Sequence, residues 1–240
     1  MRPKPMIEIG GKPILWHILK IYSAQGFNDF IVCLGYKGHA IKDYFLNYAK
    51  YNSDFTVDLR TGAVSMHRTA SEPWSVTLVE TGDTTMTGGR LKRIAPLVGD
   101  DAFFCTYGDG VGNVDLKALL DLHRREGRIA TVTAAAPPGR FGALRTEGAR
   151  VTSFTEKPSD GEGTVNAGFF VFSPRVFEYI AGDATSLEQE PMQRLARDGQ
   201  LSAYRHRGFW QPMDTVRDRR KLDELWNNGN PPWFAGPAGG

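Results

Sequence analysis

The sequence has 240 residues, of which 41% are hydrophobic and 23% are charged. These values are typical of one large folded domain or two small ones, and they exclude a disordered or fibrous chain. Because 29 Lys and Arg nearly balance 27 Asp and Glu, for a net charge of +2, we expect no general binding to nucleic acid or to an acidic membrane, and any anionic ligand needs a local site.

Helix-like and strand-like patterns alternate through the first half of the chain. After Pro13, apolar residues recur at helical spacing as far as Tyr22, and Gly26 is a typical stop signal. The next segment, 29–36, is continuously apolar, as in a strand that is covered on both faces. The same alternation continues with helices around Ile41–Tyr48, Leu91–Ala95 and Leu116–His123, and strands at 75–80, 102–107 and 129–136. The pattern predicts an α/β fold with a doubly wound, mostly parallel sheet.

Two segments depart from this alternation. Residues 54–74 show a two-residue period around an Arg-Thr-Gly turn, which predicts a β-hairpin inserted into the α/β array. A second hairpin is expected from Phe141, with its turn at Glu147 and Gly148, followed by a strand in GFFVFS. After helices near 188–197 and 215–226, we expect the single domain to end at residue 228 and a loose Gly/Pro-rich tail to follow at 229–240.

The two cysteines, Cys33 and Cys105, lie in apolar segments, and their separation matches no metal or redox motif. We therefore expect two reduced core residues. The longest apolar segments are strand-sized, far below the ~18 residues of a membrane span, and the N-terminus lacks the apolar part of a signal peptide. The sequence predicts a cytoplasmic protein that makes no membrane contact.

The segment Thr106-Tyr107-Gly108-Asp109-Gly110 directly follows an apolar strand. Ligands of open α/β sheets bind at the carboxyl ends of strands, where Asp109 could hold a Mg²⁺ bound to phosphates. An ordinary turn explains the same residues equally well. A second carboxylate, Asp214, stands just before the last predicted helix, where an N-cap is the stronger explanation unless it meets Asp109 in space.

Two lysines stand beside prolines, in Pro3-Lys4-Pro5 and in Glu156-Lys157-Pro158. Proline restricts the residue before it to an extended backbone and could direct each lysine toward a phosphate, although a solvated surface lysine is the simpler explanation. The segment 86–90, MTGGR, suits a phosphate at a helix N-terminus, and ordinary helix entry explains it nearly as well.

Taken in order, these segments resemble the sugar-phosphate nucleotidyltransferases over nearly the whole chain. The PKPM, GDG and EKP blocks are typical of that family, whereas SDFTVDL, EPWSVTLVETG, MTGGRLKR and WQPMDT are similar to its cytidylyltransferase branch. The resemblance implies a Rossmann-like nucleotidyltransferase fold. It also implies a Mg²⁺-dependent reaction in which CTP and α-D-glucose 1-phosphate give CDP-glucose and pyrophosphate, for nucleotide-sugar and polysaccharide biosynthesis.

The resemblance implies a role for each matching residue. Asp109 and Asp214 would hold the metal, and Lys4 would contact the nucleotide phosphates and stabilise the group in transfer. Lys157 would bind the phosphate of glucose 1-phosphate. The remaining substrate contacts would come from Glu156, Asn166 and Gly168 to sugar hydroxyls, from Thr85 and Arg90 to the nucleotide, and from Gly108, which would let the nucleotide pass close to the backbone.

Members of this family open with a strand and a GGxGTR loop upstream of the PKP block, and this sequence begins at that block. We therefore expect the domain to be N-terminally incomplete by one strand and one loop, roughly 15 to 25 residues. Each lost phosphate donor would cost on the order of 10²-fold in rate, so we expect little turnover.

Other functions remain open on the sequence alone. A non-catalytic homologue could keep only the sugar-phosphate site, and a transferase could use UTP or dTTP instead of CTP. Phe55, Trp74 and Phe209 lie outside the α/β alternation, so they serve either contacts between subunits of a homo-oligomer or core packing.

Overall fold

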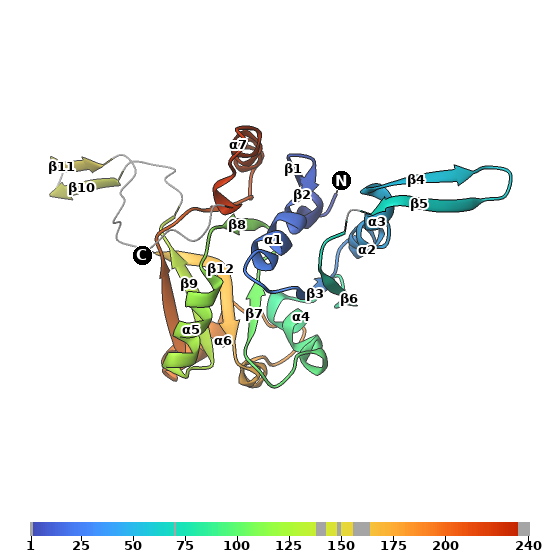
Figure 1. The fold of residues 1–240 in the computed structure, drawn as a ribbon. Coiled ribbons are helices and arrows are strands. Elements are labelled where there is room, and N and C mark those ends of the chain that lie inside the picture. Colours follow the sequence, from blue (N-terminus) through green and yellow to red (C-terminus); the bar gives the residue numbers. More distant parts are fainter. Residues whose placement is uncertain (1, 70, 138–142, 148–149, 156–163, 235–240) are drawn as a thin grey trace.

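The computed structural model describes residues 2–69, 71–137, 143–147, 150–155 and 164–234, in which helices and strands alternate (Figure 1). A four-stranded sheet has the order β13-β9-β12-β7. Its strands are β7 (Phe103–Thr106), β9 (Ala130–Ala135), β12 (Val165–Phe172) and β13 (Leu201–His206). β13 is parallel to β9, whereas β12 is antiparallel to both of its neighbours. β3 (Asp29–Leu34) and β6 (Ser75–Glu80) form a separate parallel pair.

The sheet is buried on both faces, as the continuously apolar strands predict. Alternate residues of β12 point to opposite sides, so Phe169 belongs to one apolar core and Phe170 to another. On the first side, helix α1 (Ile14–Ser23) places Tyr22 against Phe169, with ring centroids 6.2 Å apart, and against Phe104 of β7 at 5.7 Å. On the other side, Leu91 of helix α4 (Thr87–Arg93) shares a core with Phe170. The predicted α/β fold class is confirmed, but the four-stranded sheet is not mostly parallel as expected, because β12 runs antiparallel to both of its neighbours.

The remaining helices follow the predicted pattern with shifted bounds. The helix expected through Tyr48 is split into α2 (Gly38–Leu46) and α3 (Tyr48–Tyr51), and α4 gives way to a 3₁₀ turn, η2 (Ala95–Leu97), at Pro96, which lacks an N–H donor. The later helices are α5 (Leu116–Glu126), α6 (Glu190–Arg197) and α7 (Val216–Asn227), and the 3₁₀ turns include η1 (Lys4–Met6) and η3 (Pro174–Tyr179).

Both predicted hairpins are present. β4 (Ser53–Asp58) pairs antiparallel with β5 (Ala63–Thr69) and projects away from the sheets (Figure 1). The chain reverses there through Gly62, whose φ of +74° is strained for other residues. β10 (Ala143–Glu147) pairs with β11 (Arg150–Thr155), while Gly148 of the predicted turn lies outside the described residues. Two further ribbons were not predicted, β1 (Glu8–Ile9) with β2 (Lys12–Pro13) and β8 (Gly110–Gly112) with β14 (Trp210–Pro212).

The prediction of a loose tail from residue 229 is wrong for the part that the structure describes. Residues Pro232–Phe234 form a 3₁₀ turn, η4, and Trp233 is only 2% exposed. The Trp233 indole donates a hydrogen bond to His17 of α1, with 3.3 Å between the nitrogens. Burial of a tryptophan stabilises the fold, so the packed domain extends at least to residue 234. Within the described ranges, no helix is long and apolar enough to cross a membrane.

Candidate functional site

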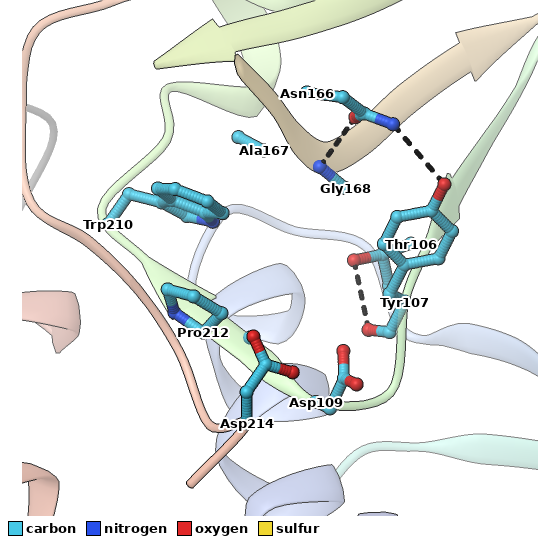
Figure 2. A pocket seen from close by; sticks show the side chains of 10 residues that line it. Thr106, Tyr107, Asp109, Asn166, Ala167, Gly168, Trp210, Pro212 and Asp214 are labelled. Carbon is cyan, nitrogen blue, oxygen red and sulfur yellow. Dashed lines mark hydrogen bonds between the residues drawn. The ribbon is translucent and has the colours of Figure 1, made fainter. Parts of the chain in front are cut away.

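A pocket of about 250 Å³ opens beyond the end of β7, where the sequence predicts ligand binding (Figure 2). The side chains of Asp109 and Asp214 lie on one side of it, and Asn166 lies on the other beside Tyr107. Trp210 and Pro212 also line this space. One pocket therefore offers two carboxylates and an amide to a ligand, with an indole beside them.

The β8–β14 ribbon brings the two carboxylates together, although 105 residues separate them in sequence. Its register pairs Gly110 with Pro212, so Asp109 just before β8 and Asp214 just after β14 lie at the same end of the ribbon. The Met213 N–H donates to the Asp109 carbonyl, at 2.7 Å, and extends the pairing. The sequence alone could not show whether Asp109 and Asp214 lie close together, and the structure shows that they do.

Lys4 lies between these carboxylates. Its Nζ donates to Oδ2 of Asp109 at 2.8 Å and to Oδ1 of Asp214 at 2.9 Å. Partial burial opposes protonation, but the two carboxylates outweigh it and raise the pKa of Lys4, so the ammonium keeps its charge. Lys4 begins the 3₁₀ turn η1 between Pro3 and Pro5, and Pro5 lies 3.2 Å from where a side chain on Gly108 would begin. The PKP and GDG blocks are therefore packed against each other.

Asp214 is not an N-cap, contrary to the stronger of the two sequence explanations. Thr215 caps α7, its hydroxyl accepting from the N–H of Asp218 at 3.1 Å in a capping box. The Asp218 carboxylate in turn accepts from the N–H groups of Asp214 and Thr215, at 3.2 and 3.0 Å. The carboxylate of Asp214 is thus left to face Lys4, on a backbone that Asp218 holds in place.

Three residues form the opposite wall of the pocket. Asn166 accepts a hydrogen bond from the Gly168 N–H at 2.8 Å and donates to the Tyr107 hydroxyl at 3.2 Å. Gly168 has a φ of +77°, and a Cβ there would begin 2.5 Å from the Tyr107 ring. Only glycine combines this backbone conformation with so close an approach. Gly168 therefore lets the Tyr107 ring approach the β12 backbone closely beside Asn166.

Thr85 and Arg90 do not line the pocket. Thr85 is buried, and Arg90 uses its guanidinium within the protein, donating to the carbonyls of Leu34 and Asp83 and to the Thr81 hydroxyl at 2.8 to 3.3 Å. Arg90 therefore braces the turns that follow β3 and β6. Any direct contact of these two residues with a nucleotide remains a prediction.

The N-terminus of α4 is occupied by the protein rather than open to a phosphate. The Gly89 N–H donates to the Thr185 carbonyl at 3.2 Å, and the Met86 N–H donates to the Asp183 carbonyl at 2.8 Å. A Cβ at Gly89 would begin 2.5 Å from the Asp183 backbone. The two glycines of MTGGR therefore allow this close contact, and ordinary helix entry is the better explanation of the motif.

Glu156 and Lys157 lie outside the described residues, so their predicted contacts stay untested. Conversely, Tyr107 and Trp210, which line the pocket, and Glu188, which contacts Tyr107, had no role predicted from the sequence. Tyr107 lies in the TYGDG block with Asp109, and Trp210 lies in the WQPMD block with Asp214. This proximity in sequence to the two aspartates was the signal that could have identified them.

Comparison with known proteins places this geometry in a family. The model of the nucleotidyl transferase family matches residues 1–215, most of the chain. The chain belongs to the nucleotidyl transferase family. This nucleotidyl transferase is 55% identical to the glucose-1-phosphate cytidylyltransferase of Salmonella typhi, over 97% of its own length and 91% of the relative.

Solved structures agree on the fold at much lower identity. HddC from Yersinia pseudotuberculosis matches with a TM-score of 0.69 and 21% identity, covering 94% of this nucleotidyl transferase and 90% of HddC. A UDP-glucose pyrophosphorylase solved with UDP-glucose matches with a TM-score of 0.66, 16% identity, and the same two coverages. The predicted Rossmann-like nucleotidyltransferase architecture is therefore confirmed.

Proposed function

We propose that this nucleotidyl transferase forms CDP-glucose and pyrophosphate from CTP and α-D-glucose 1-phosphate. The observation that supports it best is the convergence of Lys4, Asp109 and Asp214 at a pocket that also presents Asn166. The choice of CTP and glucose 1-phosphate is supported by the identity to the Salmonella typhi cytidylyltransferase. Phosphoryl-group transfer needs little covalent chemistry from a protein, so positioning and charge are the tasks of these residues.

The reaction is a single in-line displacement. A phosphate oxygen of glucose 1-phosphate attacks the α-phosphorus of CTP, and the bond from that phosphorus to the oxygen of the β-phosphate breaks, which releases pyrophosphate. Lys4 would neutralise negative charge on the group in transfer, because its ammonium stays protonated and lies beside the two carboxylates of the pocket. No residue of the chain forms a covalent intermediate in this scheme.

Asp109 and Asp214 are suited to hold a divalent cation. Nucleotidyl transferases of this family generally use a divalent metal. The described residues include no cluster of three or more His, Cys, Asp or Glu side chains that could enclose a metal. Mg²⁺ does not need one, since it is usually bound by one or two carboxylates together with substrate phosphates and water. We infer that Mg²⁺ binds here and, when bound, neutralises phosphate charge.

The substrate contacts follow the walls of the pocket. Asn166 and Gly168 would contact sugar hydroxyls, and Gly108 would leave room for the nucleotide. Glu156 and Lys157 are assigned to the sugar and its phosphate by the family resemblance, and Thr85 and Arg90 to the nucleotide. These roles and the cytoplasmic location stay predictions.

The nucleotide choice is tested by pyrophosphate release. With glucose 1-phosphate and Mg²⁺, we expect CTP to support release at least tenfold faster than UTP, dTTP or GTP at equal concentration. Equal rates with all four nucleotides would overturn the assignment of CTP. Binding of glucose 1-phosphate without release from any nucleotide would instead favour the non-catalytic homologue.

The projecting β4–β5 hairpin supports a homo-oligomer. Its register places Phe55 opposite Met66 and Val57 opposite Val64, so four apolar side chains share one face, each between 41% and 57% exposed. A two-stranded ribbon is barely stable alone in water, which favours cover by a second copy of the chain. Phe55 is therefore not part of the core, in contrast to the core-packing alternative.

We expect the double substitution V57E/V64E to lower the mass in solution measured by light scattering to that of a monomer. Ser65→Glu on the opposite face of the hairpin is the matched control and should leave the mass of the oligomer unchanged. A wild-type chain that is already monomeric would contradict the proposed assembly.

A further inference from the structure

Glu188 lies just before α6 and connects this part of the chain to α4 and to Tyr107, which lines the pocket. Its carboxylate accepts from the Thr87 hydroxyl at the start of α4, from the Ser186 hydroxyl, and from the Tyr107 hydroxyl after β7, each at 2.7 Å. Glu188 is itself exposed, so these hydrogen bonds rather than burial hold its carboxylate. Although burial acts in the opposite direction, the three donors lower the pKa of Glu188, which keeps it ionised at neutral pH.

The charge of Glu188 fixes the direction of the neighbouring hydrogen bonds. An ionised carboxylate only accepts, so the Tyr107 hydroxyl must donate its single proton to Glu188. Burial and the adjacent carboxylate raise the pKa of Tyr107, so the phenol retains that proton. The Tyr107 oxygen is then an acceptor for the amide nitrogen of Asn166, which agrees with the Gly168 N–H, a donor that requires the Asn166 oxygen on its own side.

These hydrogen bonds leave part of the hydrogen-bonding capacity of Asn166 for a ligand. The side chain of Asn166 has two N–H donors and two acceptor lone pairs, and one of each is used by Tyr107 and Gly168. One donor and one acceptor remain on an exposed side chain that lines the pocket. A pair of adjacent sugar hydroxyls matches this set, because each hydroxyl can both donate and accept.

The backbone around Glu188 is fixed to α4 by a hydrogen bond and by close packing. The Leu187 N–H donates to the Thr87 hydroxyl oxygen at 2.9 Å, and the segment from Asp183 to Leu187 packs directly on Gly88 and Gly89. Glu188 is therefore anchored to α4 at the same time as it contacts Tyr107.

We propose that Glu188 is a positioning residue that, through Tyr107, orients the amide of Asn166 for adjacent hydroxyls of a hexose 1-phosphate. The proposal rests on the proposed function for the identity of the sugar, and on the hydrogen-bond geometry for the role of Glu188. Glu188 touches no substrate in this scheme. Glutamine in its place would both donate and accept, so the Tyr107 hydroxyl could adopt two orientations and would no longer hold the Asn166 amide nitrogen firmly, while the Gly168 N–H still holds the Asn166 oxygen.

The test compares wild type with Glu188→Gln in steady-state transfer. Because the sugar contact is equal in the ground and transition states, we expect KM for glucose 1-phosphate to rise about 3- to 10-fold, the effect of one neutral hydrogen bond, with kcat unchanged. Wild type should discriminate against at least one of the 2-, 3- and 4-deoxyglucose 1-phosphates, and E188Q should lose most of that discrimination. Glu190→Gln, two residues away and paired with Arg194 at 3.6 Å, is the matched control and should behave as wild type.

A double-mutant cycle separates positioning from a structural role. In an Asn166→Ala background, E188Q should raise KM no further, because no amide remains to be oriented. Should E188Q not fold, Tyr107→Phe removes the same connection and should give the same change in KM. Additive effects of E188Q and N166A, or an unchanged discrimination among the deoxy sugars, would overturn the proposal. If wild type releases no pyrophosphate, the proposed function fails. The role of Glu188 is then tested by calorimetric titration with glucose 1-phosphate. An equal Kd for wild type and E188Q, or no binding by wild type, would overturn that role.

Discussion

Asp109→Asn is expected to lower kcat for CDP-glucose formation by about 10²- to 10³-fold, and Asp214→Asn by a similar factor. Asparagine keeps the shape of each side chain but removes the negative charge that faces Lys4 and would bind the cation. Because both carboxylates act on one ion, the double variant should be far less impaired than the product of the two factors. Initial rates of pyrophosphate release at saturating Mg²⁺ measure this.

Asp101→Asn is the matched control for these variants. Asp101 is exposed and lies in the loop before β7, outside the pocket lining. Its replacement should leave kcat unchanged. Rates within threefold of wild type for D109N and D214N would remove these carboxylates from the mechanism.

The second large effect concerns the pH dependence of stability. His17 is fully buried in α1, its Nε2 donating to the Ile9 carbonyl at 2.9 Å while Nδ1 accepts from Trp233. Burial lowers the pKa of His17 to about 4, from 6.5 when the side chain is in water. Below pH 6.5 the unfolded chain therefore binds a proton that the folded chain excludes. The free energy of unfolding should be constant above about pH 6.5 and fall by about 3 kcal/mol as the pH drops to 4.

Urea unfolding at pH 7.5, 6.0 and 5.0 measures this loss. His17→Gln can still donate to the Ile9 carbonyl but does not titrate, so its stability should depend less on pH over this range. A smaller slope should remain, because burial also lowers the pKa of His123 and His206. If wild type and H17Q show the same slope, His17 is not the source of the acid sensitivity.

Local pattern was sufficient for most of the fold. The apolar periodicity after Pro13 and the continuous apolar strand that follows gave α1 and β3 nearly at their observed bounds, because burial on one or both faces dictates these patterns. The hairpin turn around Gly62 was likewise visible, since a positive φ restricts the residue type. By contrast, the β8–β14 ribbon has three residues in each strand, too few for any periodicity.

The site was only partly predictable for the same reason. Asp109 and Asp214 were candidates separately, but their convergence depends on the register of the short β8–β14 ribbon, a long-range property. Whether Asp214 or Thr215 caps α7 is decided by Asp218, which accepts from both backbone N–H groups. Trp233 was assigned to a loose tail because glycines and prolines surround it, and its burial against α1 follows only from the tertiary structure.

The central claim is that Asp109 and Asp214 form one divalent-cation site at this pocket, and binding of Mn²⁺ followed by electron paramagnetic resonance tests it most directly. In the presence of CTP, wild type should bind one Mn²⁺ per chain, Mg²⁺ should displace it, and D109N and D214N should each weaken binding at least tenfold while D101N does not. Binding of Mn²⁺ that is equally tight in wild type, D109N and D214N would contradict the account.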